Sequence, residues 1–178
     1  GVAIGPAGRV YVADTGNKRV QVFDTDGQFL YVWGGGGSLS GYLEEPVGIA
    51  VGPNAEVYVA DTWNRRIQVF SSAGAYIREW SIEGWDAGHS EDKYHLAAEE
   101  KPYLAVDTNG FVYVTDPSNY RVLVFDDQGN YVLSFGKQGG DASSFLLPTG
   151  IAVADDGTIY VTDAHSSRVL VFDAPDLS

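Results

Sequence analysis

The chain has 178 residues, of which 44% are hydrophobic, so it is long enough to bury a core of its own. It carries 11 Lys and Arg against 24 Asp and Glu, a formal net charge of -13. This acidic balance argues against nucleic acid as a partner, because such binding depends on basic residues that displace counterions from phosphates. The absence of cysteine excludes disulfides and thiolate metal sites, and no apolar run is long enough to insert into a membrane.

The most regular feature is a short motif, Val-Tyr-Val-Ala-Asp or a close variant, that occurs four times. An Arg follows each Asp after five residues, and a Phe follows each Arg after four. The copies begin at Val10, Val57, Val112 and Ile159. A period of about 45 residues, built from short β-branched and aromatic segments, is typical of a radial array of β-sheets.

The chain opens with a unit of residues 1–45 that lacks the proline found at the start of the later units. It begins with Gly1 in mid-repeat, which we interpret as the start of a piece of a longer protein. The connection that leaves this unit contains five consecutive small residues, 34–38, four of them glycine. Such composition predicts a flexible rim.

The second unit, residues 46–100, shows every element of the pattern. We expect strands at 49–51, 57–60, 67–70 and 76–80, with turns at 52–55 and 71–74. Nothing between them has the periodicity of a helix. Each unit is therefore expected to be an antiparallel meander of four strands, followed here by a long connection from Ser81 to Glu100.

The third unit covers residues 101–147, and the fourth, residues 148–178, ends without a turn glycine or a fourth strand. A sheet with two apolar faces cannot bury both alone, so the units should stack around an axis. We predict an all-β fold, a β-propeller of four-stranded antiparallel blades with the last blade incomplete, in a single domain of residues 1–178. Four tyrosines are expected to fill the contacts between blades: Tyr11, Tyr58, Tyr113 and Tyr160.

The second unit also carries a family resemblance. Gly48-Ile49-Ala50-Val51, the strand 57–61, the segment 64–70 and Gly74 together resemble the NHL repeat, and the fourth copy matches nearly as well. The resemblance implies a propeller that usually has six blades, so we interpret the chain as an arc of a larger ring rather than a closed ring of four. It also implies a non-catalytic module of a larger protein that binds a protein or a small ligand.

The stretch from Trp80 to Tyr103 also resembles propeller segments of large bacterial or archaeal membrane proteins of the glycosyltransferase kind. That resemblance implies an extracytoplasmic domain whose parent is attached to a membrane. The residues by themselves leave the compartment open.

An Asp and an Arg bracket the loop between the second and third strands of every unit. Because catalytic sites are rarely repeated around a ring, we interpret these pairs as charge-assisted bonds that hold the hairpins, and not as a ring of carboxylate ligands. The pairs are Asp14 with Arg19, Asp61 with Arg66, Asp116 with Arg121 and Asp163 with Arg168.

Function is expected where the copies differ. The loops between the second and third strands and the connections between units should open at the same end of the blades, because strands alternate in direction. Large side chains at non-repeated positions there are typical of a binding surface. The predicted binding residues are Trp63, Arg65, Tyr120, His165, Trp85 and His89.

A metal-dependent enzyme and an RNA-binding protein are the two alternatives to the binding module. Related propellers include lyases that cleave peptidyl-hydroxyglycine and lactonases, which hold a metal in the central channel. The first strand of each unit carries no His, Asp or Glu, and the spacing of six between His89 and His95 matches no common zinc motif. With His165 at the same end of the blades, a three-His site stays open as an alternative to ordinary exposed histidines, which are far commoner. We therefore predict no catalytic residue, metal or cofactor from this chain, and keep a metal-dependent enzyme as the alternative.

RNA binding, known for some animal members of the family, is the third hypothesis. It is supported only by a local basic spot in the first two units, made by Lys18, Arg19, Arg65 and Arg66. Tyr120 and Ser167 occupy the matching place in the other two units, which disfavours it.

Overall fold

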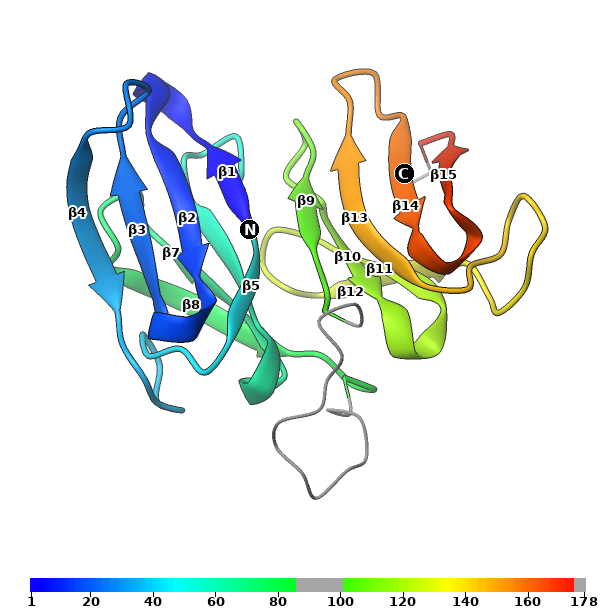
Figure 1. Ribbon diagram of the computed structural model, residues 1–178, viewed down its shortest axis with the longest axis horizontal. Coiled ribbons are helices and arrows are strands. Elements are labelled where there is room, and N and C mark those ends of the chain that lie inside the picture. Colours follow the sequence, from blue (N-terminus) through cyan, green and yellow to red (C-terminus); the bar gives the residue numbers. More distant parts are fainter. Residues whose placement is uncertain (86–100, 175–178) are drawn as a thin grey trace. The chain divides into compact units, whose positions relative to one another are not determined.

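The structure is a computed structural model that describes residues 1–85 and 101–174. Four antiparallel sheets follow one another along the chain, and the strands of each sheet lie side by side in sequence order (Figure 1). The first three sheets have four strands and the last has three. This confirms the predicted all-β fold of four-stranded meanders, and the predicted loss of the fourth strand from the last sheet.

The first two sheets belong to the first two repeats. The first consists of β1 (Val2–Ile4), β2 (Val10–Asp14), β3 (Arg19–Phe23) and β4 (Phe29–Gly34). The second consists of β5 (Pro46–Val51), β6 (Val57–Asp61), β7 (Arg66–Phe70) and β8 (Tyr76–Ser81). A single 3-10 turn, η1 (Pro6–Gly8), joins β1 to β2.

The other two sheets belong to the third and fourth repeats. The third sheet consists of β9 (Leu104–Val106), β10 (Val112–Asp116), β11 (Arg121–Phe125) and β12 (Tyr131–Phe135). The fourth consists of β13 (Pro148–Val153), β14 (Ile159–Asp163) and β15 (Arg168–Phe172). The chain divides into two compact units, residues 1–83 and 84–178, so each unit holds two neighbouring sheets.

Each blade has two faces that follow from the alternation of side chains along a strand. In the repeated motif, the Tyr points to one side, which we call the forward face, and the Asp points to the other, the rear face. In the first blade, Tyr11 pairs with Val22 and Ala13 with Val20 on the forward face. On its rear face, Val10 pairs with Phe23, and Val2 and Ile4 pair with Val12 and Val10.

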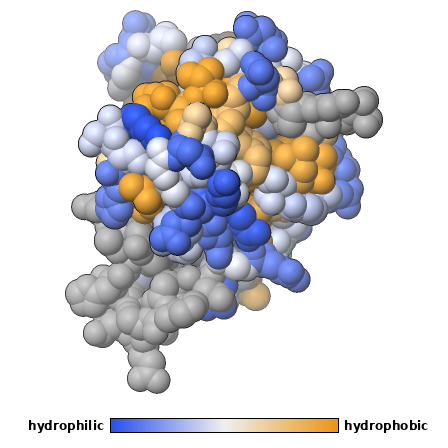
Figure 2. Space-filling model, turned by 90° about the vertical axis from the view of Figure 1, so that its right-hand side faces the viewer, coloured by the Kyte–Doolittle hydropathy of each residue, from blue (hydrophilic) through white to orange (hydrophobic). Residues whose placement is uncertain are grey.

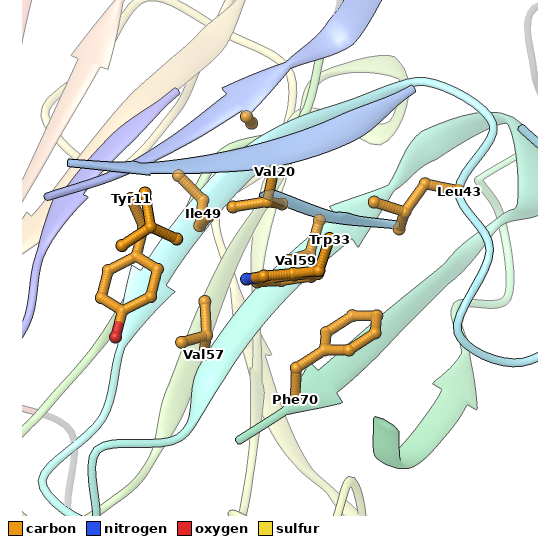
Figure 3. Close-up of a cluster of buried hydrophobic side chains, with 10 residues drawn as sticks. Tyr11, Val20, Trp33, Leu43, Ile49, Val57, Val59 and Phe70 are labelled. Atoms are coloured by element: carbon orange, nitrogen blue, oxygen red, sulfur yellow. The ribbon is translucent and has the colours of Figure 1, made fainter. Parts of the chain in front are cut away.

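The core of the first unit lies between the forward face of the first blade and the rear face of the second (Figure 3). The first blade contributes Tyr11, Val20, Val22 and Trp33, and the second contributes Ile49, Val57, Val59 and Phe70, all of them buried. The Trp33 and Phe70 rings lie 4.4 Å apart between centroids. Burying one such side chain stabilises the fold by about 1.5–3 kcal/mol, so this interface holds the two sheets together.

The second unit repeats this arrangement with its own residues. Tyr113, Val122 and Val124 of the third blade's forward face form one cluster with Ile159 and Val161 of the fourth blade's rear face. The forward tyrosines Tyr11 and Tyr113 are 1% exposed, whereas Tyr160 of the last blade is 43% exposed. The predicted role of the repeated tyrosine therefore holds for Tyr11 and Tyr113, whereas Tyr160 lies on the last blade that the structure describes.

The connection after the first blade differs from the flexible rim that its glycines predict. The Gly37 N–H donates to the Leu43 carbonyl at 3.1 Å, and the Leu43 N–H donates to the Gly35 carbonyl at 2.8 Å. The Leu43 side chain is fully buried in the core of the first unit. The glycines thus serve a tight, closed loop in which Gly35 and Gly37 adopt positive φ, and the buried leucine fixes its end.

Candidate functional site

The candidate site is the end of the blades that carries the loops between the second and third strands. Each loop is one turn of 3-10 helix: η2 (Thr15–Asn17), η3 (Thr62–Asn64), η4 (Pro117–Asn119) and η5 (Ala164–Ser166). The residue that follows each turn has φ between 52° and 56°, in the left-handed region, and its N–H donates to the first carbonyl of the turn. These residues are Lys18, Arg65, Tyr120 and Ser167. One backbone geometry therefore presents four different side chains.

The repeated Asp and Arg meet in all four loops. The Arg nitrogen nearest the Asp Oδ2 lies at 2.8, 2.9, 2.8 and 3.3 Å in chain order. In the first three loops an Asn side chain also donates to the Asp, at 2.8–3.0 Å, and in the fourth the Ser166 hydroxyl does so at 2.5 Å. These bonds join the side chains on either side of each turn and fix the turn from inside.

In the second blade, the Asp–Arg pair also holds the connection that arrives from the first blade. The Glu44 N–H donates to Asp61 at 2.7 Å, while the Arg66 guanidinium donates to the carbonyls of Leu39 and Tyr42 at 3.1 and 2.9 Å. Arg66 and Asp61 are 7% and 0% exposed. The pair therefore joins the second blade to the connection from the first. The repeated sequence does not reveal this role, because the pair bonds to backbone N–H and carbonyl groups of that connection.

The fourth blade uses the same device. Asp163 accepts hydrogen bonds from the backbone N–H groups of Leu147 and Leu146 at 2.6 and 3.0 Å. Arg168 donates to the carbonyls of Gly140 and Ser144 at 2.8 and 2.9 Å. Equivalent contacts in the second and fourth blades support the interpretation of these pairs as scaffold.

The repeated carboxylates differ in pKa because their surroundings differ. Hydrogen bonds from Arg19 and Asn17 hold the pKa of Asp14 below its ordinary value. Burial raises the pKa of Asp116 and outweighs its bonds to Arg121 and Asn119. The pKa of Asp163 is lowered, because the bonds from Ser166 and from the backbone of Leu147 and Leu146 outweigh its burial.

We expect the pKa of Asp14 to lie below that of an ordinary aspartate, which is about 3.9, and the pKa of Asp116 to lie above it. The stability that Asp14 contributes is present above its unfolded-state pKa and is lost as the pH falls through its lowered folded-state pKa. As the pH falls through that range, the free energy of unfolding of the Asp14→Asn variant should therefore decrease less than that of the unsubstituted chain. Titration of the carboxyl carbons by NMR checks the order of the two pKa values. Coincident titration of the two groups would contradict it.

The predicted binding residues are not equally accessible. Arg65 and His165 are exposed, whereas Trp63 is partly buried and Tyr120 lies partly buried against the core of the second unit. Trp85 differs from expectation, because only 6% of it is exposed, so its ring lies inside and not on a surface. His89 and His95 lie outside the described residues. Arg65 and His165 are thus the exposed members of the predicted set within the described residues.

Contacts between the loops and the connections confirm that both lie at one end of each blade. Lys18 forms an ion pair with Glu44, and Asn64 donates to the Gly37 carbonyl at 3.0 Å. In the second unit, Asn119 donates to the Gly84 carbonyl at 2.9 Å. A shallow hollow of about 350 Å³ lies beside the last loop, lined by Thr162, Asp163, Ala164, Ser167, Arg168 and Val169.

Within residues 1–85 and 101–174, no three His, Asp or Glu side chains come together as a metal would require. No helix there has the length and apolar character needed to cross a membrane.

Stacked four-stranded meanders with a repeated Asp–Arg loop define a β-propeller protein, and comparison with known families agrees. The family model of the NHL repeat matches residues 1–23 and 43–70, and a family model described as a 6-bladed beta-propeller matches residues 100–178. The NHL-repeat match thus lies in the first two repeats of the chain, and the propeller match covers the last two. No curated protein sequence matches the chain.

Solved structures resemble the chain in fold. A streptogramin B lyase aligns with a TM-score of 0.66 at 15% identity over 98% of this chain and 54% of its own. Virginiamycin B lyase from Staphylococcus aureus aligns with a TM-score of 0.64 at 17% identity, over 98% and 55%. Kuenenia stuttgartiensis hydrazine synthase aligns with a TM-score of 0.61 at 13% identity, over 97% and 48%. The chain thus spans about half the length of these structures, and identities this low show the fold alone.

Proposed function

We propose that the chain is a non-catalytic binding module that recognises a protein or small ligand through the loops between the second and third strands. The observation that carries the proposal is the contrast within these loops. Their backbone and their internal Asp–Arg bonds are the same in every blade, while the side chain after each turn changes from Lys18 to Arg65, Tyr120 and Ser167. A rigid frame with varied, outward side chains is the arrangement of a recognition surface.

Each unit has its own loops, and the proposed contact residue is Arg65 in the first unit and His165 in the second. Both are exposed, and both occur at positions that the repeat does not conserve between blades. Arg is enriched among the residues that dominate binding energy, and a rigid turn lowers the entropy lost when a ligand binds. Trp63 and Tyr120 support the loops as well as the surface, since each is partly buried.

The lyase names of two similar structures describe those proteins. For this chain, the alternative of a metal-dependent enzyme needs His, Asp or Glu side chains that converge. The carboxylates of the Asp–Arg pairs already accept hydrogen bonds from Arg, Asn and backbone N–H groups. Such carboxylates are acceptors already in use, which favours the binding module.

The proposal is tested with a displayed library of random peptides selected on the immobilised chain. We expect selected peptides to bind at least about tenfold more weakly to Arg65→Ala/His165→Ala, because the loops lose their exposed contacts. The matched control is Asp26→Ala/Gln128→Ala, which removes two exposed side chains at the turns at the other end of the blades and should bind normally. Equal weakening by both variants, or a selection that enriches no peptide, would count against this surface.

A further inference from the structure

The turn between β9 and β10 of the third blade contains the one Asn–Gly pair of the sequence, Asn109 followed by Gly110. The matching turn of the second blade has Asn54 followed by Ala55. In both turns the residue after the asparagine has a positive φ, +94° for Gly110 and 61° for Ala55. Its N–H donates to the carbonyl at the start of the turn, at 3.1 and 3.0 Å. The two turns therefore match in their backbone and differ in whether a Cβ follows the asparagine.

An Asn–Gly pair is open to a reaction that needs no enzyme. The backbone nitrogen of the glycine attacks the side-chain carbonyl carbon of the asparagine, its proton passes to water, and the side-chain amide leaves as ammonia. Water then opens the resulting succinimide ring at either carbonyl, which gives aspartate or, with the backbone moved to the β carbon, isoaspartate. Because glycine has no Cβ, its nitrogen approaches without the hindrance that a following alanine adds.

Water has access to the turn of the third blade, because Thr108 and Asn109 are both exposed. The matching turn of the fourth blade, between β13 and β14, lies at the upper end in Figure 1. Hydrophilic side chains line the upper edge of the face that Figure 2 shows. The water that the reaction consumes is therefore available at the reacting side chain.

Hydrogen bonds to Asp107 hold the backbone on both sides of the reacting atoms. Asp107 Oδ1 accepts from the N–H groups of Asn109 and Phe111, both at 2.9 Å, and the Asp107 carbonyl accepts from Gly110. Asp107 Oδ2 accepts from the Tyr113 hydroxyl at 3.3 Å, and Asp107 is only 9% exposed. Attack on the asparagine requires the Gly110 nitrogen to give up its bond and its proton. The turn must therefore open first, as local segments of folded proteins do without global unfolding.

We propose that Asn109 is a site of spontaneous deamidation, and that the opening of this turn sets its rate. The product carries a negative charge in the turn that already holds the Asp107 carboxylate. A Cβ on Gly110 would lie 3.5 Å from Cβ of Asp127, so a third carboxylate is close. Isoaspartate also lengthens the backbone by one carbon between the two N–H groups that Asp107 holds. Repulsion and the longer backbone both weaken the turn, so the reaction loosens the third blade irreversibly.

Peptide mapping by mass spectrometry of the full 178-residue chain during incubation in buffer tests the proposal. Aspartate and isoaspartate should accumulate at Asn109, and at Asn54 at least about tenfold more slowly, which corresponds to a barrier higher by about 1.4 kcal/mol. The matched variant is Gly110→Ala, because Ala55 shows that the turn accepts alanine at positive φ. It should slow the reaction at Asn109 to the rate at Asn54. Equal rates at the two asparagines, or an unchanged rate in the variant, would overturn the proposal.

Two further variants test control by the turn. Ala55→Gly moves the Asn–Gly pair into the second blade, where Gly52 stands in place of Asp107 and has no side chain to hold the turn. Asn54 of this variant should react faster than Asn109 in the folded chain and at a similar rate in urea, where both turns are open. Asp107→Ala should speed the reaction at Asn109 in the folded chain but not in urea. Circular dichroism checks that each variant folds, and Ala55→Gly replaces only an exposed turn, so it keeps the test valid if Asp107→Ala unfolds. A folded chain that reacts as fast at Asn109 as the chain in urea would refute control by the turn.

Discussion

Asp61→Ala is expected to destabilise the chain by about 3–5 kcal/mol, the cost of removing one member of a buried ion pair. The Arg66 side chain is 8% exposed and would keep Glu79 as its remaining carboxylate partner, at 3.1 Å. The backbone N–H of Glu44, the Asn64 amide and the Gln68 amide would also lose the acceptor they share. Leaving buried donors unsatisfied adds to the loss.

Asp14→Ala is the matched control, because it makes the same change in the first blade. Asp14 and Arg19 are 18% and 39% exposed at their side chains, and water can replace the lost bonds. We therefore expect a cost of about 1 kcal/mol, in line with exposed pairs. Urea denaturation of both variants measures the difference in free energy of unfolding. Equal losses would show that burial and the contact with the preceding connection do not set the strength of the pair.

Gly74→Ala should destabilise the chain by about 3 kcal/mol. Gly74 has a φ of +87° in the turn between β7 and β8, and an added Cβ would lie 2.7 Å from Cβ of Trp33, with the indole nearer still. Since Trp33 is buried in the core of the first unit, its ring has little room to move away. The cost combines about 1–2 kcal/mol for the left-handed backbone and about 1–3 kcal/mol for overpacking.

Gly27→Ala separates the two contributions. Gly27 holds the same place in the turn of the first blade, with a φ of +78° and no atom within 4 Å of an added Cβ. Only the backbone cost of about 1–2 kcal/mol should remain. Thermal or urea unfolding of the pair reports the contribution of the Trp33 contact as a difference. If both variants lost the same stability, the contact between the turn of the second blade and the first blade would be refuted.

The strands and their order were predictable because side-chain alternation and turn residues are local signals. The predicted strand at 49–51 was too short, since the observed strand begins at Pro46. Pro46 pairs with Asp61 on the far side of an irregularity in the ladder, and local sequence patterns do not predict such irregularities. In the described residues the last sheet has three strands, in line with the absence of a turn glycine after Phe172. The flexible rim predicted from glycines 34–37 was wrong. A run of glycines is compatible both with a flexible segment and with a closed loop, and here the buried Leu43 fixes the loop.

The site was predictable only in part. The Asp–Arg pairs were recognised by repetition, but their bonds to the preceding connection involve backbone groups, which leave no trace in side-chain patterns. The exposure of Trp85 was wrongly inferred from its place in a long connection, although a large aromatic side chain gains more by burial. Arg65 and His165 are exposed, because one follows a 3-10 turn and the other lies in the middle of one.

The left-handed residue after each 3-10 turn shows how the blades of this chain can differ at one position. Lys, Arg, Tyr and Ser all occupy that position at nearly the same φ, so one backbone geometry accepts long, aromatic and small side chains there. The Asp–Arg bonds that shape the turn are made by other side chains. A substitution at this position can therefore change the chemistry that one blade presents while the backbone of its loop stays the same.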